Sequence, residues 1–273
     1  MPNAPEASPT SSAEPRSRRD VRVVLGAASL VLLAALFAVT LLLVEDRWGP
    51  LLRADRTVHD GLHRYAVNHS GFVAAMQLIS SSGSALVWIV VLALVVAWLL
   101  WRRLPRLALF VVITAAGSSL LNAVVKTTVH RLRPVLTDPV ANAHGLSFPS
   151  AHAQAAVVGC AVLLIVFWPI LHEAWRGCAV TSAVVTVLAI GFSRIALGVH
   201  YVSDVVGGFF LGAAWVAAVT VAFNVMRGDR GHCADKTPGL QPQVSSRSVA
   251  RLAGEQPSTR RANAFADSPR CRS

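Results

Sequence analysis

The chain has 273 residues, of which 54% are hydrophobic and only 14% are charged, and its mean hydropathy is +0.54. About a quarter of the residues in a soluble domain are charged, so the composition excludes an ordinary soluble protein and favours a membrane protein. The formal net charge is +11. It does not indicate nucleic-acid binding, because the basic residues gather in the two tails and one short loop, where they suit an anionic membrane face.

The N-terminal part of the chain contains one apolar run that is long enough to span a bilayer. Residues 1–21 are rich in Pro, Ser, Ala and Arg and are predicted to form a disordered cytoplasmic tail. Residues 22–44 form the first predicted span, which is too long for the apolar region of a cleaved signal peptide and is interpreted as a retained anchor. Residues 45–83 combine balanced charges with apolar residues at helical spacing, which predicts one or two short helices at the membrane interface.

Five further apolar runs follow, and each is predicted to be a helix because backbone polar groups in lipid must be satisfied within their own segment. They lie at about residues 84–101, 107–125, 151–171, 177–193 and 203–226. The predicted fold is therefore all-α: a six-transmembrane-helix bundle over residues 22–226, with an interfacial helical segment between spans 1 and 2. The basic and polar residues 227–273 are predicted to form a disordered cytoplasmic tail.

The distribution of arginines predicts the orientation of this bundle. Arginines concentrate in the N-terminal tail, in the loop at 102–106 and in the C-terminal tail, which share one side of the membrane if there are six spans. The positive-inside rule assigns that side to the cytoplasm. Both termini are therefore predicted to be cytoplasmic, and the connections after the third and fifth spans are predicted to face outward.

Three polar clusters lie in those two outward connections. They read KTTVHRLRP (Lys126–Pro134), FPSAH (Phe148–His152) and SRIALGVHYVSD (Ser193–Asp204). A single cation beside a span is most simply an anchor that reaches the headgroups. Positive charge is disfavoured on the outer side, however, and here arginines recur together with histidines in both connections. The repetition indicates a site that carries out chemistry.

The cations of these clusters suit the binding of a phosphate group. Lys126, Arg133 and Arg194 supply donors for phosphate oxygens, and arginine is suited to bidentate contact. Ser150 and the backbone N–H groups at the start of the fourth span can donate to the same anion. If the third span continues as a helix to Pro134, Lys126, His130 and Arg133 share one helix face.

The two motif histidines differ in their neighbours. His200 lies four residues before Asp204, and an acid one helical turn away can hold an imidazole in one tautomer and stabilise its cation. His152 has no such partner in the sequence and is free to act as a general acid. We interpret His130 and Arg131 as solvated loop residues beside the site, and Asp55 and His59 as more remote candidates for contact with it.

These clusters resemble the three signature motifs of the type 2 phosphatidic acid phosphatase superfamily, K-x6-RP, PSGH and SR-x5-H-x3-D. The first and third motifs match at every fixed position, and the second departs only at Ala151, where glycine is usual. The resemblance covers residues 45–226. It implies that the phosphate is bound by Lys126, Arg133, Ser150, Arg194 and the backbone amide of Ala151.

The resemblance also implies a mechanism. His200 attacks phosphorus and becomes a phosphohistidine, Asp204 orients His200, and His152 protonates the leaving oxygen. No metal and no other cofactor is expected, because the cationic side chains of the protein neutralise the transferring group and the motifs lack the clustered carboxylates that Mg²⁺ prefers.

The predicted function is that of a metal-independent integral membrane phosphatase acting on a lipid phosphomonoester or diphosphate at the outer face of a bacterial plasma membrane. Recycling of a polyprenyl diphosphate is the favoured activity, and phosphatidic acid or phosphatidylglycerol phosphate are the other substrates. Two alternatives stay open: a lipid phosphotransferase in which an alcohol replaces water, and a non-catalytic protein that binds or transports a lipid phosphate. The expected partners are the lipid substrate and membrane lipids, with no nucleic acid.

Overall fold

The computed structural model describes residues 14–134, 139–141 and 145–234, and every regular element in those ranges is a helix. They are α1 (Glu14–Glu45), α2 (Gly49–Val67), α3 (Ser70–Ser82), α4 (Ala85–Trp101), α5 (Pro105–Val129), α6 (Ala151–Phe167), α7 (Glu173–Ala196) and α8 (Val202–Ala234). Residues 1–230 form one compact unit, and of the second unit, residues 231–273, only the end of α8 is described. The all-α prediction is confirmed for the described residues.

Most of these helices have the length and composition of membrane spans. Five segments qualify: Val23–Glu45, Ser70–Trp101, Pro105–Val129, Glu173–Ala196 and Val202–Val225. Apolar side chains such as Leu94 and Leu120 are 66% and 67% exposed, as expected for helix faces that meet lipid. α6 is apolar but has only 17 residues, fewer than the about 20 that a straight span needs. The sixth span of the predicted bundle therefore depends on this shorter helix.

The region before α4 differs from the sequence prediction. We expected interfacial helices up to residue 83 and a span over 84–101, but α3 carries no charged side chain and forms one apolar segment with α4. The two helices are separated at Gly83, where a Cβ atom would lie only 2.5 Å from Cγ2 of Ile190 in α7. Ser84 then caps α4 by accepting a hydrogen bond from the amide of Val87 at 3.4 Å. Of the expected interfacial helices, only α2 is amphipathic.

The first and last helices extend beyond the predicted spans. α1 begins at Glu14, upstream of residue 22, and an acid followed by Pro15 suits a first helical turn. α8 continues to Ala234, past residue 226. The remaining parts of the two predicted tails, residues 1–13 and 235–273, lie outside the described residues.

The central helix of the compact unit is α6. It packs against α4, α5 and α7, and its Val162 is fully buried together with Leu99 of α4 and Val111 of α5. α8 also approaches α6 closely, because a Cβ atom at Gly208 would lie only 2.7 Å from the carbonyl oxygen of Ser150. This packing places the beginning of α8 beside the beginning of α6.

Candidate active site

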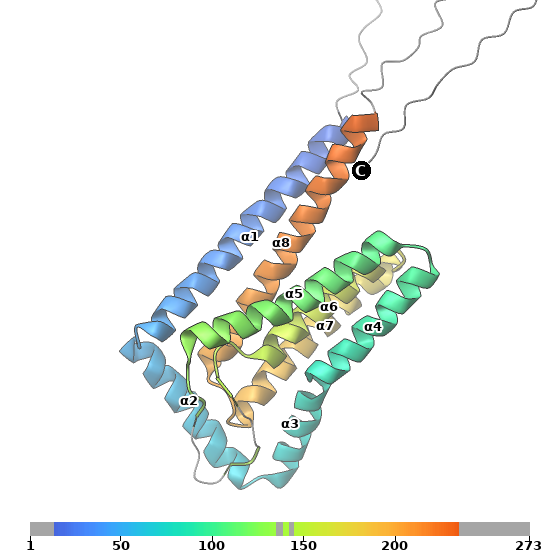
Figure 1. Ribbon diagram of the computed structural model, residues 1–273. Helices are drawn as coiled ribbons and strands as arrows, with labels where there is room; N and C mark the ends of the chain where they lie inside the picture. Colours follow the sequence, from blue (N-terminus) through green and yellow to red (C-terminus); the bar gives the residue numbers. More distant parts are fainter. Residues whose placement is uncertain (1–13, 135–138, 142–144, 235–273) are drawn as a thin grey trace, which may run out of the picture. The chain divides into compact units, whose positions relative to one another are not determined.

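The three polar clusters converge at one end of the compact unit, where α2 also lies (Figure 1). Two backbone hydrogen bonds join them: the amide of Ser147 donates to the carbonyl of Arg131 at 2.7 Å, and the amide of Ser150 donates to the carbonyl of Asp204 at 2.9 Å. The loop after α5 is thereby fixed to the segment before α6, and that segment is fixed to the first turn of α8.

The end of α5 is set by His130. This residue has a φ of 50° and terminates the helix in the left-handed conformation. Lys126, His130 and Arg133 therefore do not share a helix face, and the expectation of a helix continuing to Pro134 is wrong. His130 is exposed, and its Nδ1 lies 3.2 Å from the carbonyl oxygen of Thr128 in the last turn of α5.

The turn after His130 directs Arg133 onto the turn between α7 and α8. Nη1 of Arg133 donates to the carbonyl of Val199 at 2.8 Å and lies 3.0 Å from Nε2 of His200. Nζ of Lys126 donates to the carbonyl of Leu146 at 3.1 Å. Both cations thus lie over the segments that carry the other motifs.

The imidazole of His200 is held from one side. It is 1% exposed, and its Nδ1 lies 3.5 Å from Oδ2 of Asp204. The hydroxyl of Ser147 donates to the same carboxylate oxygen and lies 3.4 Å from Nδ1. Nδ1 therefore faces the acid, and Nε2 is the ring atom that faces the cation of Arg133.

Burial controls the charge of this imidazole. It lowers the pKa of His200 to about 4, and although the contact with Asp204 and its charge act to raise the pKa, the cations Arg133 and Arg194 lower it further. We expected the acid to make the imidazole basic, and the balance runs the other way. A neutral ring at pH 7 has an unshared electron pair on one nitrogen, which is the form a nucleophile needs.

Two other motif residues, Arg194 and Ser150, have buried polar atoms with no hydrogen-bond partner among the described residues. Arg194 is 9% exposed, and its Nη1 donates to the hydroxyl of Ser80 in α3 at 2.5 Å, whereas its Nε is buried with no hydrogen-bond partner among the described residues. The hydroxyl of Ser150 is likewise buried and unpartnered within the described part of the chain. Buried donors that lack a partner are costly, and these two fit the oxygens of an anion.

His152 and Ala151 lie in the first turn of α6, directly after Ser150. The amides of a first turn have no partner within their helix and favour negative charge. The imidazole of His152 is half-buried and interacts electrostatically with Arg194, His200 and the two other motif cations. The structure thus brings together all eight predicted site residues: Lys126, Arg133, Ser150, Ala151, His152, Arg194, His200 and Asp204.

Sequence reasoning named Asp55 as a remote candidate for contact with the site but missed its pairing with Arg131 behind Asp204. Arg131 was expected to be a solvated loop residue, but its side chain is only 11% exposed and contacts Asp204 and Asp55. Asp55 of α2 is 1% exposed. The signal in the sequence is the spacing of Asp55, His59 and Ala66, which places them on one helix face, and all three are buried.

A second buried polar cluster lies one helical turn from the motifs and was also missed. Nδ2 of Asn122 donates to Oε1 of Gln154 at 2.7 Å, and Nε2 of Gln154 donates to the carbonyl and hydroxyl oxygens of Ser118 at 2.9 and 2.7 Å. These bonds join α5 to α6 about one helical turn before Lys126 in α5 and just after His152 in α6. Their role is to hold the two motif-bearing helices in register.

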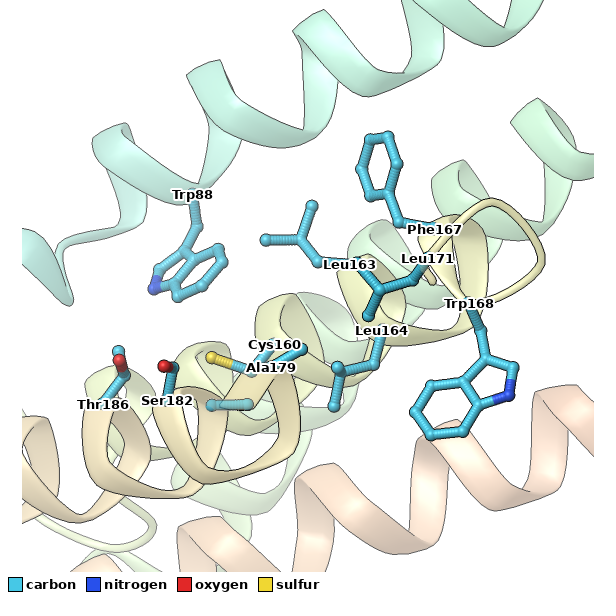
Figure 2. Close-up of a pocket in the computed structure, with 11 residues that line it drawn as sticks. Trp88, Cys160, Leu163, Leu164, Phe167, Trp168, Leu171, Ala179, Ser182 and Thr186 are labelled. Atoms are coloured by element: carbon cyan, nitrogen blue, oxygen red, sulfur yellow. The ribbon is translucent and has the colours of Figure 1, made fainter. Parts of the chain in front are cut away.

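A cavity of about 390 Å³ lies between α4, α6 and α7 (Figure 2). Its lining is mostly apolar and includes Trp88 of α4, Cys160 and Phe167 of α6, and Thr186 of α7. None of the motif residues lines it. The cavity is therefore separate from the cluster of cations and histidines, which lies at the beginning of α6.

No group of three or more His, Cys, Asp or Glu side chains within the described residues is arranged to hold a metal ion. Independence from metal ions stays a prediction.

The PAP2 superfamily model matches residues 106–227, a range that contains all three motifs. The curated proteins that are similar to this chain include a phosphatidylglycerophosphatase and two polyprenyl-related phosphatases. Phosphatidylglycerophosphatase B of Bacillus subtilis is 38% identical over 96 residues, which are 34% of this chain and 46% of that protein, so this chain spans about half of its length. Undecaprenyl-diphosphatase of Sulfolobus acidocaldarius is 28% identical over 54% of this chain and 68% of its own. Decaprenylphosphoryl-5-phosphoribose phosphatase of Mycobacterium tuberculosis is 33% identical over 56% of this chain and 81% of its own.

One solved structure has the same fold. It is the crystal structure of a transmembrane PAP2-type phosphatidylglycerolphosphate phosphatase from Bacillus subtilis, with a TM-score of 0.64, 24% identity, and coverage of 72% of this chain and 96% of that chain.

Proposed function

Since this chain belongs to the PAP2 superfamily, we propose that it is an integral membrane lipid phosphatase that works through a phosphohistidine at His200. The observation that carries the proposal is the position of that imidazole. Its Nδ1 lies against Asp204 and its Nε2 faces Arg133, in a cluster of cations that includes buried donors with no hydrogen-bond partner among the described residues. Such a cluster can bind a phosphoryl group and stabilise the charge that develops on its oxygens during transfer.

The reaction has two steps. In the first, Nε2 of His200 attacks phosphorus, the bond to the lipid oxygen breaks, and His152 donates a proton to that oxygen. In the second, His152 accepts a proton from water, the hydroxide attacks the phosphohistidine, and inorganic phosphate leaves. Asp204 stabilises the positive charge on His200 in both steps. Lys126, Arg133, Arg194, Ser150 and the amide of Ala151 bind the phosphoryl oxygens.

We propose polyprenyl-linked phosphates, and a polyprenyl diphosphate above all, as the substrate class. Two of the similar proteins are named for polyprenyl substrates, an undecaprenyl diphosphate and a decaprenylphosphoryl phosphoribose. Phosphatidylglycerophosphate is the second candidate, because the 38% identical relative is named for that substrate. Phosphatidic acid presents the same phosphomonoester to the same cations.

The test is the release of inorganic phosphate by the purified, detergent-solubilised protein from each of these lipids, compared by kcat/KM. A polyprenyl diphosphate should give the highest value. Transfer of the phosphoryl group to an added alcohol in preference to water would instead indicate a phosphotransferase. Binding of the lipids without release of phosphate would indicate a transport or binding protein, and His200→Ala serves as the inactive control.

We also propose that α6 is a sixth span, that both termini are cytoplasmic and that the active site faces outward from a bacterial plasma membrane. The distribution of arginines supports this orientation. A cysteine introduced at Ala141, in a background with the four native cysteines replaced by serine, should react with an impermeant thiol reagent on intact cells. Reaction only after lysis would contradict the orientation.

A further inference from the structure

A carboxylate of α2 lies behind the proposed catalytic residues. Asp55 is 1% exposed, although it belongs to a helix with three arginines and a largely polar surface. Its Oδ1 accepts a hydrogen bond from the amide of Ser203 at 3.0 Å, and its Oδ2 accepts one from the hydroxyl of the same residue. Ser203 precedes Asp204 in the first turn of α8. α2 is thus hydrogen-bonded to the turn that carries Asp204.

Arg131 joins the two carboxylates. Its Nη2 lies 2.9 Å from Oδ2 of Asp55, and its Nη1 lies 2.6 Å from Oδ1 of Asp204. The guanidinium also lies over the ring of Tyr201, with 4.5 Å from its carbon to the ring centroid. The side chain of Arg131 is 11% exposed, and those of the two acids are 2% and 0% exposed. We call Asp55, Arg131 and Asp204 the carboxylate clamp.

In the clamp, the two carboxylate oxygens of Asp204 have different partners. Oδ1 of Asp204 is occupied by Arg131. Oδ2 accepts from the hydroxyl of Ser147 and from the amide of Tyr201 and faces the imidazole of His200. Because each oxygen has its own donors, the carboxylate cannot rotate about its Cβ–Cγ bond without breaking charge-assisted hydrogen bonds. Arg131 therefore keeps Oδ2 directed at the histidine.

The charge of the clamp depends on Asp55. A guanidinium paired with Asp204 alone would cancel the negative charge of that acid and leave little to stabilise a positive His200. With Asp55 ionised as well, two carboxylates share one guanidinium, and the clamp keeps one net negative charge. The cation accumulating on His200 during phosphoryl transfer is then matched by a buried negative charge, which acts strongly at low dielectric.

We propose that Asp55 and Arg131 are positioning residues of the proposed phosphatase, through which α2 fixes the carboxylate of Asp204 and sets the charge that it presents to His200. The inference rests on the proposed function. It assigns a role in the chemistry to the amphipathic helix, which lies outside the segment matched by the superfamily model.

Four variants separate this role from simple packing. Asp55→Asn keeps the shape of the side chain but makes the clamp neutral, and Arg131→Gln makes it doubly negative. The double variant Asp55→Asn with Arg131→Gln restores one net negative charge, and both substituted positions then carry an amide side chain. The matched control is Glu173→Gln with Arg176→Gln, an exposed ion pair of 3.4 Å at the opposite end of α7.

The measurement is the profile of kcat/KM against pH. The quantity compared is the apparent pKa of its acid limb, the range in which kcat/KM falls as the pH is lowered. The elements around His200 carry these titratable or charged groups: Lys126 of α5, Arg131 and Arg133 of the following loop, His152 of α6, Arg194 of α7, Tyr201 of the turn, Asp204 of α8, and Asp55 and His59 of α2. All of these except the substituted clamp residues are unchanged among the variants. The same substrate is used throughout, so a difference in the apparent pKa of the acid limb between variants is caused by the change in the clamp.

In Asp55→Asn, kcat should fall by about tenfold to a hundredfold, and the acid limb should move to lower pH. KM should stay within about threefold of the wild-type value, since neither Asp55 nor Arg131 is proposed to bind phosphate. Arg131→Gln should move the limb to higher pH by about one unit, as expected for a buried neighbouring charge. The double variant should return the limb to within about 0.3 unit of the wild type. If Arg131→Gln does not fold, the other two variants still decide the matter.

A second measurement does not need turnover. Protein labelled at the histidine rings is titrated by NMR in detergent, with the His200 signal assigned by its loss in His200→Gln. The ring pKa should be highest in Arg131→Gln, lowest in Asp55→Asn, and alike in the double variant and the wild type. If the wild type releases no phosphate but this order appears, the proposed function fails and the clamp stands. An unchanged limb and an unchanged ring pKa in all variants, with only lower thermal stability, would overturn the inference.

Discussion

The two halves of the candidate site differ in how far the protein satisfies its own polar groups. In the half formed by the turn between α7 and α8, His200 and Asp204 contact Ser147, Arg133 and Arg131. In the half formed by the beginning of α6 and the end of α7, Ser150 and Arg194 have buried donors with no partner in the described part of the chain. The first half is fixed before substrate arrives. The second half is arranged to receive the oxygens of an anion.

The largest expected effect comes from the nucleophile. His200→Ala should reduce turnover by about 10³-fold or more and abolish the phosphoenzyme, because His200 is the proposed nucleophile and forms the covalent intermediate. His152→Ala should keep residual turnover of p-nitrophenyl phosphate, whose leaving group needs no proton. Acid-labile phosphoenzyme, trapped and counted by mass spectrometry, should form in the second variant and not in the first. The reverse pattern would exchange the two roles.

The junction between the halves should be nearly as sensitive. In Gly208→Ala the new Cβ would meet the carbonyl oxygen of Ser150 at 2.7 Å, so α8 must move away from the beginning of α6. Turnover should fall by more than about tenfold, because misplacement of about 1 Å has effects of this size or larger. Gly71→Ala, where nothing lies within 4 Å of the added atom, is the matched control. Equal activity of both variants would show that the close approach does not align the site.

Two serines test the comparison directly. The hydroxyl of Ser147 donates to Asp204, whereas the hydroxyl of Ser150 has no partner among the described residues. Ser147→Ala should lower the free energy of unfolding by about 1–3 kcal/mol, since it leaves a buried carboxylate with one donor fewer. Ser150→Ala should leave stability unchanged and raise KM about tenfold through the loss of one hydrogen bond to a charged group. Thermal denaturation and steady-state kinetics measure the two effects, and loss of stability in Ser150→Ala would contradict the assignment.

The low pKa of His200 predicts how acidification acts on the fixed half. With a pKa of about 4 in the folded protein against an ordinary value of 6.5, the ring is neutral when folded and takes up a proton on unfolding. The stabilisation is therefore present above about pH 6.5 and is lost as the pH falls toward 4. His200→Gln should lose less stability than the wild type over this window when melting temperatures are compared. Parallel curves for the two proteins would show an ordinary pKa in the folded state.

The smallest expected effect is that of chelation. The cations proposed to bind the phosphate are side chains, and no metal-binding cluster lies within the described residues. EDTA should leave phosphate release within experimental error of the untreated enzyme. Activity that is lost on chelation and regained with Mg²⁺ would show that the receiving half needs an ion from solution.

Much of the fold was predictable because lipid restricts the possibilities. Apolar runs of about 20 residues predict helices, since no other regular structure in a single run satisfies its backbone in a bilayer. The ends of these helices were predicted less well. The break at Gly83 depends on Ile190 of α7, and the end of α5 depends on the backbone of His130. Contacts between distant segments decide such boundaries, and a hydropathy pattern contains no information on them.

The sequence by itself determined the identity of the motif residues and their spacing, because the order and separation of residues such as His200 and Asp204 along the chain do not depend on the fold. Only the tertiary structure decided what surrounds them. Asp55 lies 76 residues from Arg131 and 149 from Asp204 in the sequence, and its local spacing indicates a shared helix face with His59 but does not identify these two partners. Packing of α2 against α7 excludes water from these three side chains. Their charges must then be satisfied by one another, which is why Arg131, a charge that looks solvated in the sequence, is buried in ion pairs in the fold.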